Sequence, residues 1–147
     1  YIYIKTEWWW HKIEDIKIFI CTHGRFGEEL VKSAEMIGGK LPNVKTFSLM
    51  SNMSPEEYKT TIENELNNTK KFLFLIDLFG GTPFNVVAML RKKYDITIVT
   101  GVNLNMLLEV CINLKNMDIE QLANLAYNSL KESGKMISEK KSEVDYE

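Results

Sequence analysis

"FICTHGRFGEEL" (residues 19–30) holds the end of an apolar strand, a break at a glycine, and the first turn of a helix. The β-rich run that it ends, "IKIFIC" (16–21), is typical of a strand covered on both faces of a parallel sheet. Gly38 and Gly39 end the helix. Helical spacing over 26–37 places four apolar residues on one side: Leu30, Val31, Ala34 and Ile37. This stretch therefore predicts the opening half of a β-α-β unit.

The rest of the chain repeats the alternation of strand and helix. Further apolar strands are predicted at 44–49, 72–77 and 95–100. Helices follow each of them, and three begin at caps or first-turn prolines: Ser54-Pro55 with Glu57, Thr82-Pro83, and Asp118. Because these crossovers are too long for hairpins, the pattern predicts a doubly wound, flavodoxin-like α/β fold. Its mostly parallel sheet has the order 2-1-3-4, with helices on both faces.

Polar residues and glycines predict where the later helices end. The second helix ends in the polar stretch 67–71 and the third near Lys92. A short fourth helix covers about 103–111, and the last ends at Gly134. After it, "KMIS" (135–138) is a candidate for one more short strand.

The 147 residues suffice for one domain, which we place at 16–138, between a leader (1–15) and a polar tail (139–147). The leader contains three consecutive tryptophans, which cannot all face one core from a helix or a strand. We interpret it as an extension or added leader, or alternatively as a surface that packs on a partner. His11 lies in this segment and is interpreted as a solvated residue rather than a ligand.

Composition excludes several classes of protein. The formal net charge is −2, and no basic cluster interleaved with aromatic residues is present, which argues against a nucleic-acid partner. No apolar run is long enough for membrane insertion, and the N-terminus lacks a signal-peptide cleavage site. Cys21 and Cys111 form neither a disulfide framework nor a metal-type spacing, so we expect no metal, no cofactor and a cytoplasmic location.

Two loops are predicted to meet at the carboxyl edge of this sheet. In the order 2-1-3-4, strands 1 and 3 are neighbours at the point where ligands of open α/β sheets bind. The loop after strand 1 offers an imidazole and a glycine: Thr22, His23 and Gly24. The loop after strand 3 offers a carboxylate and a glycine-rich helix start: Asp77, Gly80, Gly81 and Thr82.

Each of these groups has a use in phosphoryl transfer. A neutral imidazole at His23 can be a nucleophile, and a hydrogen bond to Asp77 would fix its tautomer and stabilise positive charge on the ring. The glycines and the helix start suit a phosphoryl group. Simpler interpretations remain open: His23 as an ordinary loop residue, Asp77 as a turn or cap residue, and "GGTP" (80–83) as a plain turn into a helix.

Three stretches resemble one known family. They are "IFICTHGRFGEELVKSAEMIGG" (18–39), "FLFLIDLFGGTPFNVVAML" (72–90) and "IVTGVNLNMLLEV" (98–110). In this order and spacing they are similar to the enzyme IIA domain of the mannose class of the bacterial phosphoenolpyruvate-dependent sugar phosphotransferase system. The likeness covers about 16–137, most of the chain.

The resemblance implies a role for each matching position. His23 would accept phosphate from the carrier protein HPr and pass it to a histidine of the IIB domain, with Asp77 hydrogen-bonded to His23. Family members are homodimers that exchange a C-terminal strand, expected to be antiparallel, for which 135–138 is the best match. Phosphate-binding roles fall to Thr22, Gly24, Gly80, Gly81 and Thr82. Candidates for partner docking are Arg25, Phe26 and Phe79, with Phe84 beside them.

Some positions depart from the family or stay ambiguous. Asn105 stands where the family often has proline, so we expect a changed start of the fourth helix. Arg25 is interpreted either as a phosphate or partner contact or as a solvent-facing loop residue. The phenylalanines are interpreted either as docking residues or as core residues.

Three other functions stay open at this point. One is the related phosphate donor subunit of dihydroxyacetone kinase, although the full "GGTPFN" loop (80–85) favours the sugar-transport group. Another is a regulatory module that senses phosphorylation of His23. The third is a non-catalytic flavodoxin-like domain with an incidental histidine. The sequence indicates neither the sugar nor whether IIB is fused or separate.

Overall fold

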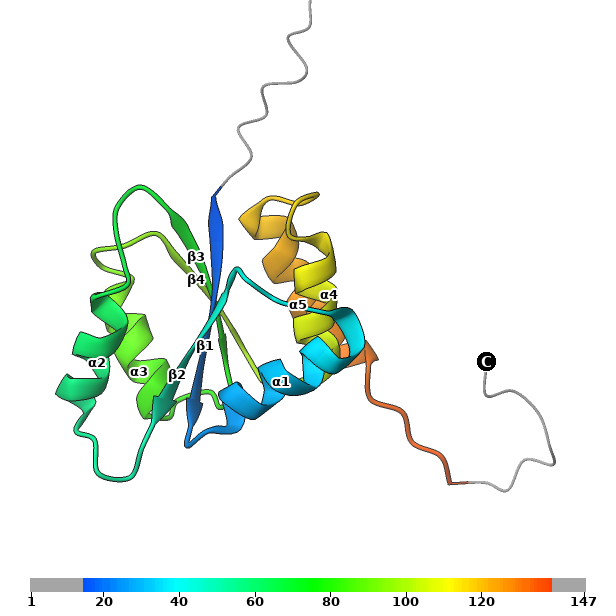
Figure 1. Cartoon of the computed structure of the whole chain (residues 1–147), viewed down its shortest axis with the longest axis horizontal. Helices are drawn as coiled ribbons and strands as arrows, with labels where there is room; N and C mark the ends of the chain where they lie inside the picture. Colours follow the sequence, from blue (N-terminus) through cyan, green and yellow to red (C-terminus); the bar gives the residue numbers. More distant parts are fainter. Residues whose placement is uncertain (1–14, 139–147) are drawn as a thin grey trace, which may run out of the picture.

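The computed structural model describes residues 15–138, which form one parallel sheet between two layers of helices (Figure 1). The strand order is β2-β1-β3-β4, so the predicted order is confirmed. The strands are β1 (Ile16–His23), β2 (Val44–Leu49), β3 (Lys71–Ile76) and β4 (Ile96–Thr100). The helices of the described region are α1 (Phe26–Gly38), α2 (Pro55–Glu63), α3 (Thr82–Leu90), α4 (Leu104–Asn113) and α5 (Ile119–Glu132).

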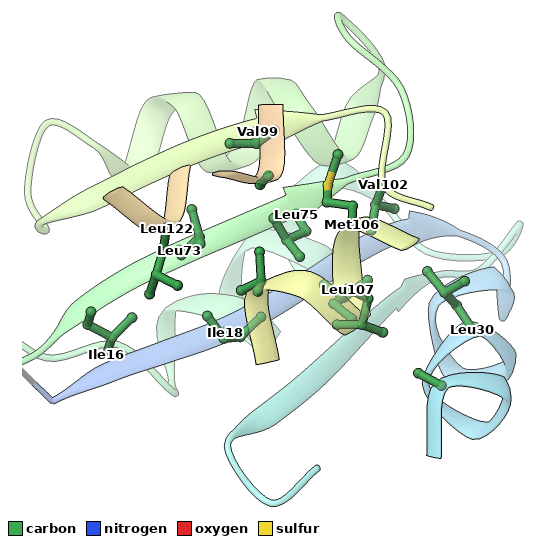
Figure 2. Close-up of a cluster of buried hydrophobic side chains, with 14 of the residues drawn as sticks. Ile16, Ile18, Leu30, Leu73, Leu75, Val99, Val102, Met106, Leu107 and Leu122 are labelled. Atoms are coloured by element: carbon green, nitrogen blue, oxygen red, sulfur yellow. The ribbon is translucent and has the colours of Figure 1, made fainter. Parts of the chain in front are cut away.

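Strand alternation divides the core into two chemically different halves. Figure 1 shows α1, α4 and α5 on one face of the sheet and α2 and α3 on the other. Even-numbered residues of β1 point to the first face and Phe19 and Cys21 to the second. The first half is aliphatic, with Ile18, Leu73 and Leu107 among its buried side chains (Figure 2).

The second half is aromatic. The ring of Phe19 packs against three other phenylalanines at centroid distances of 5.0, 5.1 and 5.3 Å: Phe47, Phe72 and Phe74. Tyr58 of α2 is fully buried beside them and donates a hydrogen bond from its hydroxyl to the Phe47 carbonyl oxygen at 2.8 Å. Burial raises the pKa of Tyr58, so this hydroxyl stays protonated and α2 is fixed to β2.

The helix starts confirm two of the three predicted caps. Ser54 and Glu57 form a reciprocal capping box, and Asp118 forms one with Gln121. The predicted cap at Thr82 is wrong, because Gly81 is the N-cap and Thr82 is the first helical residue, with no side-chain cap. Asn103 caps α4.

The unusual Asn105 is accommodated without disturbing this helix. It is the second residue of α4, which begins at Leu104. Its amide donates to the Ser129 hydroxyl of α5 at 2.7 Å. Asn105 therefore makes a polar contact between α4 and α5.

Several predicted boundaries differ from the structure. β1 continues through His23, because His23 pairs with Leu49 of the neighbouring β2, whereas the sequence pattern ended the strand at 21. The helices α2 and α3 end early, at Glu63 and Leu90. Ile37, predicted on the buried side of α1, is 66% exposed, so the buried face of this helix ends before its last turn.

At the C-terminal end of the described region, residues 135–138 form no strand, and Met136 and Ile137 are exposed there. The predicted leader, apart from Asp15, and the tail 139–147 lie outside the described residues. Within 15–138, no helix has both the length and the apolar content needed to cross a membrane.

Candidate functional site

The predicted pair of His23 and Asp77 lies at the carboxyl edge of the sheet. β1 and β3 are adjacent, and the backbone N–H of Asp77 donates to the Cys21 carbonyl at 3.3 Å. Asp77 Oδ2 lies 2.9 Å from His23 Nδ1 and accepts from the backbone N–H of His23 at 2.9 Å. Because a carboxylate can only accept, Nδ1 carries a proton, and in the neutral imidazole Nε2 then has the free lone pair.

Exposure separates the roles of these two side chains. The His23 side chain is 48% exposed and that of Asp77 only 15%. Asp77 Oδ1 is buried and has no hydrogen-bond partner among residues 15–138, so the hydrogen bonds to this carboxylate within that region come from His23 alone. The site therefore has a half-exposed imidazole that is held by a largely buried carboxylate.

Gly81 packs directly against the other side of the imidazole. A Cβ at this position would lie 2.9 Å from His23 Cε1 and 3.4 Å from Nε2. The backbone of Gly81 is extended, with φ −78°, so any residue could adopt it. Glycine is therefore required here by the closeness of the ring, whereas Gly80 is favoured by its φ of +82°.

The start of α3 lies beside this ring because Gly81 is its N-cap. Thr82 is the first residue of the helix, and Pro83 follows it without an N–H group. The first turn of a helix has free N–H groups and the positive end of the helix dipole. The structure thus brings His23, Asp77, Gly81 and the start of α3 together at one edge of the sheet.

Thr22 and Gly24 shape the loop around His23. Thr22 is fully buried, and its hydroxyl accepts from the Gly27 N–H at 2.9 Å and donates to the Gly24 carbonyl at 3.3 Å. Gly24 has a φ of +54° and open space where a Cβ would be. The side chain of Thr22 therefore joins β1 to α1 beneath the histidine, and Gly24 provides the left-handed turn.

Exposed apolar side chains follow both His23 and Asp77 in the chain, and together they are called the apolar rim here. Phe26 is 47% exposed and Phe79 is 74% exposed, and the ring of Phe84 packs on that of Phe79 at 4.8 Å. Leu78, which the sequence reasoning missed, is 57% exposed between Asp77 and the glycine turn. An apolar residue directly after a strand-end carboxylate is the signal that could have found it.

Arg25 lies beside this rim as the N-cap residue of α1. It is exposed, and its side chain makes no cap hydrogen bond. No hydrogen bond or ion pair joins its guanidinium to residues 15–138. The cation is therefore accessible one residue beyond Gly24.

The two thiols offer no competing nucleophile. Burial raises the pKa of the Cys21 thiol to about 12 and that of Cys111 to about 11, so both stay protonated near neutral pH. Cys21 lies in the aromatic half of the core, and Tyr58 and Asp77 contribute smaller effects to its pKa. Over the described range, no group of three or more His, Cys, Asp or Glu side chains is placed to hold a metal ion.

Known proteins are similar to this chain in sequence and in fold. Residues 17–127 match the EIIA-man family model, described as "PTS system fructose IIA component". The chain is 31% identical over 128 residues to the sorbose-specific EIIA component of Lacticaseibacillus casei, covering 85% of this chain and 93% of that protein. It is 33% identical over 135 residues to the mannose-specific EIIAB component of Escherichia coli K12, covering 85% of this chain but only 40% of that protein.

Solved structures agree with these matches. The mannose/sorbose-specific IIA subunit from Enterococcus faecalis superposes with a TM-score of 0.80 at 26% identity, covering 88% of this chain and 99% of that one. The EIIA component from Streptococcus agalactiae gives a TM-score of 0.77 at 31% identity, with 82% and 96% covered. With the family model matched over most of its length, the chain belongs to the mannose-class EIIA family of the sugar phosphotransferase system.

Proposed function

We propose that this component of a sugar phosphotransferase system carries phosphate on His23. The imidazole would accept a phosphoryl group from phospho-HPr and pass it to a IIB domain for sugar uptake. The observation that carries the proposal is the bond from Asp77 Oδ2 to His23 Nδ1 at 2.9 Å, on a ring that is half exposed. In the neutral imidazole this bond puts the free lone pair on Nε2, as a nucleophile requires.

The transfer step follows from this geometry. The lone pair of Nε2 attacks phosphorus as the phosphorus–nitrogen bond to the HPr histidine breaks, and the ring becomes positively charged. Asp77 stabilises that charge through the Nδ1 proton. The phosphoryl oxygens would lie near Gly81 and the free N–H groups of the α3 start, with the Thr82 hydroxyl close by. Transfer to IIB is the same step in reverse, with a new acceptor.

Both partners have to dock over the same histidine. The exposed side chains of Phe26, Leu78 and Phe79 offer them an apolar contact surface, and Arg25 adds a cation at its edge. Thr22 and Gly24 would support the phosphate loop through its backbone. We place this exchange in the cytoplasm, because its reducing conditions keep unpaired cysteines such as Cys21 and Cys111 as thiols.

We also propose the homodimer that the family resemblance implies. β4 is an edge strand of the sheet, and beside it a hollow of about 460 Å³ is lined by residues of α3, β4 and α5. The exposed apolar segment 135–138 would pair with β4 of a second copy. Light scattering on the chain and on a version truncated after Gly134 tests this: the first should be a dimer and the second a monomer.

Labelling tests the central proposal. The protein is incubated with phosphoenolpyruvate, enzyme I and HPr, and its intact mass is measured. Wild type should gain one acid-labile phosphoryl group, and His23→Ala none. If wild type stays unlabelled, the proposal is wrong.

A chase then separates this function from its rivals. Labelled protein is mixed with a IIB domain or with the subunits of a dihydroxyacetone kinase. Rapid loss of label to IIB supports sugar transport, and loss to the kinase supports the donor subunit. Label that neither acceptor removes would indicate a regulatory module instead.

A further inference from the structure

Asn85 is part of the glycine-rich loop but has no role in the mechanism above. It belongs to the first turn of α3, and its backbone N–H donates to the Gly81 carbonyl at 2.9 Å as an ordinary helical bond. Its side chain adds a second bond, from Nδ2 to the Gly80 carbonyl at 3.3 Å. One residue therefore binds both carbonyl groups of the Gly80–Gly81 turn.

This turn needs such a restraint more than other parts of the site. Two consecutive glycines have more backbone freedom than any other pair, and Gly80 has a φ of +82° with open space around it. The preceding residues Leu78 and Phe79 are largely exposed, so packing holds them weakly. Hydrogen bonds to the two carbonyls replace the packing that a glycine turn lacks.

The position of the turn determines the surroundings of the reactive nitrogen. Gly81 is close enough to the imidazole that a Cβ would lie 2.9 Å from His23 Cε1 and 3.4 Å from Nε2. Asp77 holds the ring at Nδ1 and leaves the Cε1–Nε2 edge to Gly81. A small shift of the turn would therefore change the space around Nε2 and its distance from the α3 start.

We propose that Asn85 is a positioning residue of the site: its amide fixes the Gly80 carbonyl and so holds Gly81 against the ring of His23. The expected effect on phosphoryl transfer rests on the proposed function, whereas the effect on the turn does not. Asn85→Ala removes the amide, and Asn85→Asp keeps its shape but cannot donate to Gly80. Asn113→Ala is the matched control, because Asn113 of α4 donates to the Glu109 carbonyl at 2.9 Å away from the site.

Two measurements on these variants test the proposal. In ¹⁵N relaxation of the unphosphorylated protein, the order parameters of Gly80 and Gly81 should fall in both Asn85 variants and stay unchanged in Asn113→Ala. Labelling of His23 by phospho-HPr should slow about tenfold in both Asn85 variants, as expected for a misplaced reactive group. Thermal unfolding midpoints should stay within a few degrees of wild type, because the lost bond is exposed.

The two measurements can fail independently. Unchanged order parameters overturn the proposal, whatever happens to the rate. Looser glycines with an unchanged labelling rate overturn it too, since the position of the turn would then not matter. If wild type is never labelled, the proposed function fails, while the relaxation comparison still decides whether Asn85 fixes the turn.

Discussion

The two loops that meet at the site are built in opposite ways. The loop after β1 is fixed from beneath: His23 still belongs to the strand, and the fully buried Thr22 hydroxyl bonds to Gly24 and Gly27. The loop after β3 is exposed and held by the side chain of Asn85. Under the proposed function, the histidine that accepts phosphate stands on the fixed strand end, whereas Leu78 and Phe79 of the docking surface stand on the exposed loop.

Asp77 connects the two loops. It is the first residue after β3, and its Oδ2 atom binds both the backbone and the ring of His23, 54 residues away in sequence. Removing its carboxylate would break both of these contacts between the loops, whereas the other substitutions act on one loop or the other.

The largest effect is expected from Asp77. Asp77→Ala should keep the fold but slow the labelling of His23 on the order of 10²-fold or more, because nothing then fixes the tautomer or stabilises the charged ring. Asp77→Asn keeps the shape without the charge and should be similarly slow. Rapid-quench labelling measures the rate, and circular dichroism checks the fold. Unchanged transfer kinetics would remove Asp77 from the mechanism.

Substitutions of two glycines, one on each loop, should have different effects. One acts through contact with the His23 ring and the other through backbone strain. In Gly81→Ala the methyl group meets the ring of His23, so labelling should slow about tenfold or more with little loss of stability. In Gly24→Ala no atom is in the way, but the φ of +54° costs about 1–2 kcal/mol of unfolding free energy. Urea denaturation and labelling on both variants test this. If labelling slowed more in Gly24→Ala than in Gly81→Ala, contact with the His23 ring would not be what limits the rate.

Thr22 tests how the first loop is fixed. Thr22→Val keeps the shape but leaves the buried Gly27 N–H without its acceptor, which should lower the unfolding free energy by about 1–3 kcal/mol. Thr22→Ser keeps the hydroxyl and should lose less. Denaturant titration of both variants gives the values. Equal losses would mean that the methyl group, rather than the hydroxyl, holds the loop.

Phe79 on the second loop should have the smallest effect on stability. Because its side chain is 74% exposed, Phe79→Ala should change the unfolding free energy by less than about 0.5 kcal/mol. The concentration of phospho-HPr that half-saturates labelling should nevertheless rise several-fold. Met36→Ala, at a residue in the last turn of α1 that is even more exposed, is the control and should change neither quantity. An unchanged half-saturation in Phe79→Ala would exclude it from the docking surface.

Much of the fold was predictable because its signals are local. Apolar runs, the capping residues Ser54 and Asp118, and long crossovers are read over a few neighbouring positions, and they led to the confirmed order β2-β1-β3-β4. The exact ends were less predictable. β1 extends to His23 because β2 pairs with it, and no local pattern in β1 records that pairing.

Which residues reach the carboxyl edge was predictable from the chain alone, since an imidazole after one strand and a carboxylate after another follow from strand position. The contacts of each atom at that edge depend on the tertiary structure. It buried the Thr22 hydroxyl, brought Asp77 Oδ2 to the backbone N–H and the ring Nδ1 of His23, and set Gly81 against the ring. These contacts depend on distances between segments far apart in the chain, which packing of the two core halves fixes and no local pattern encodes.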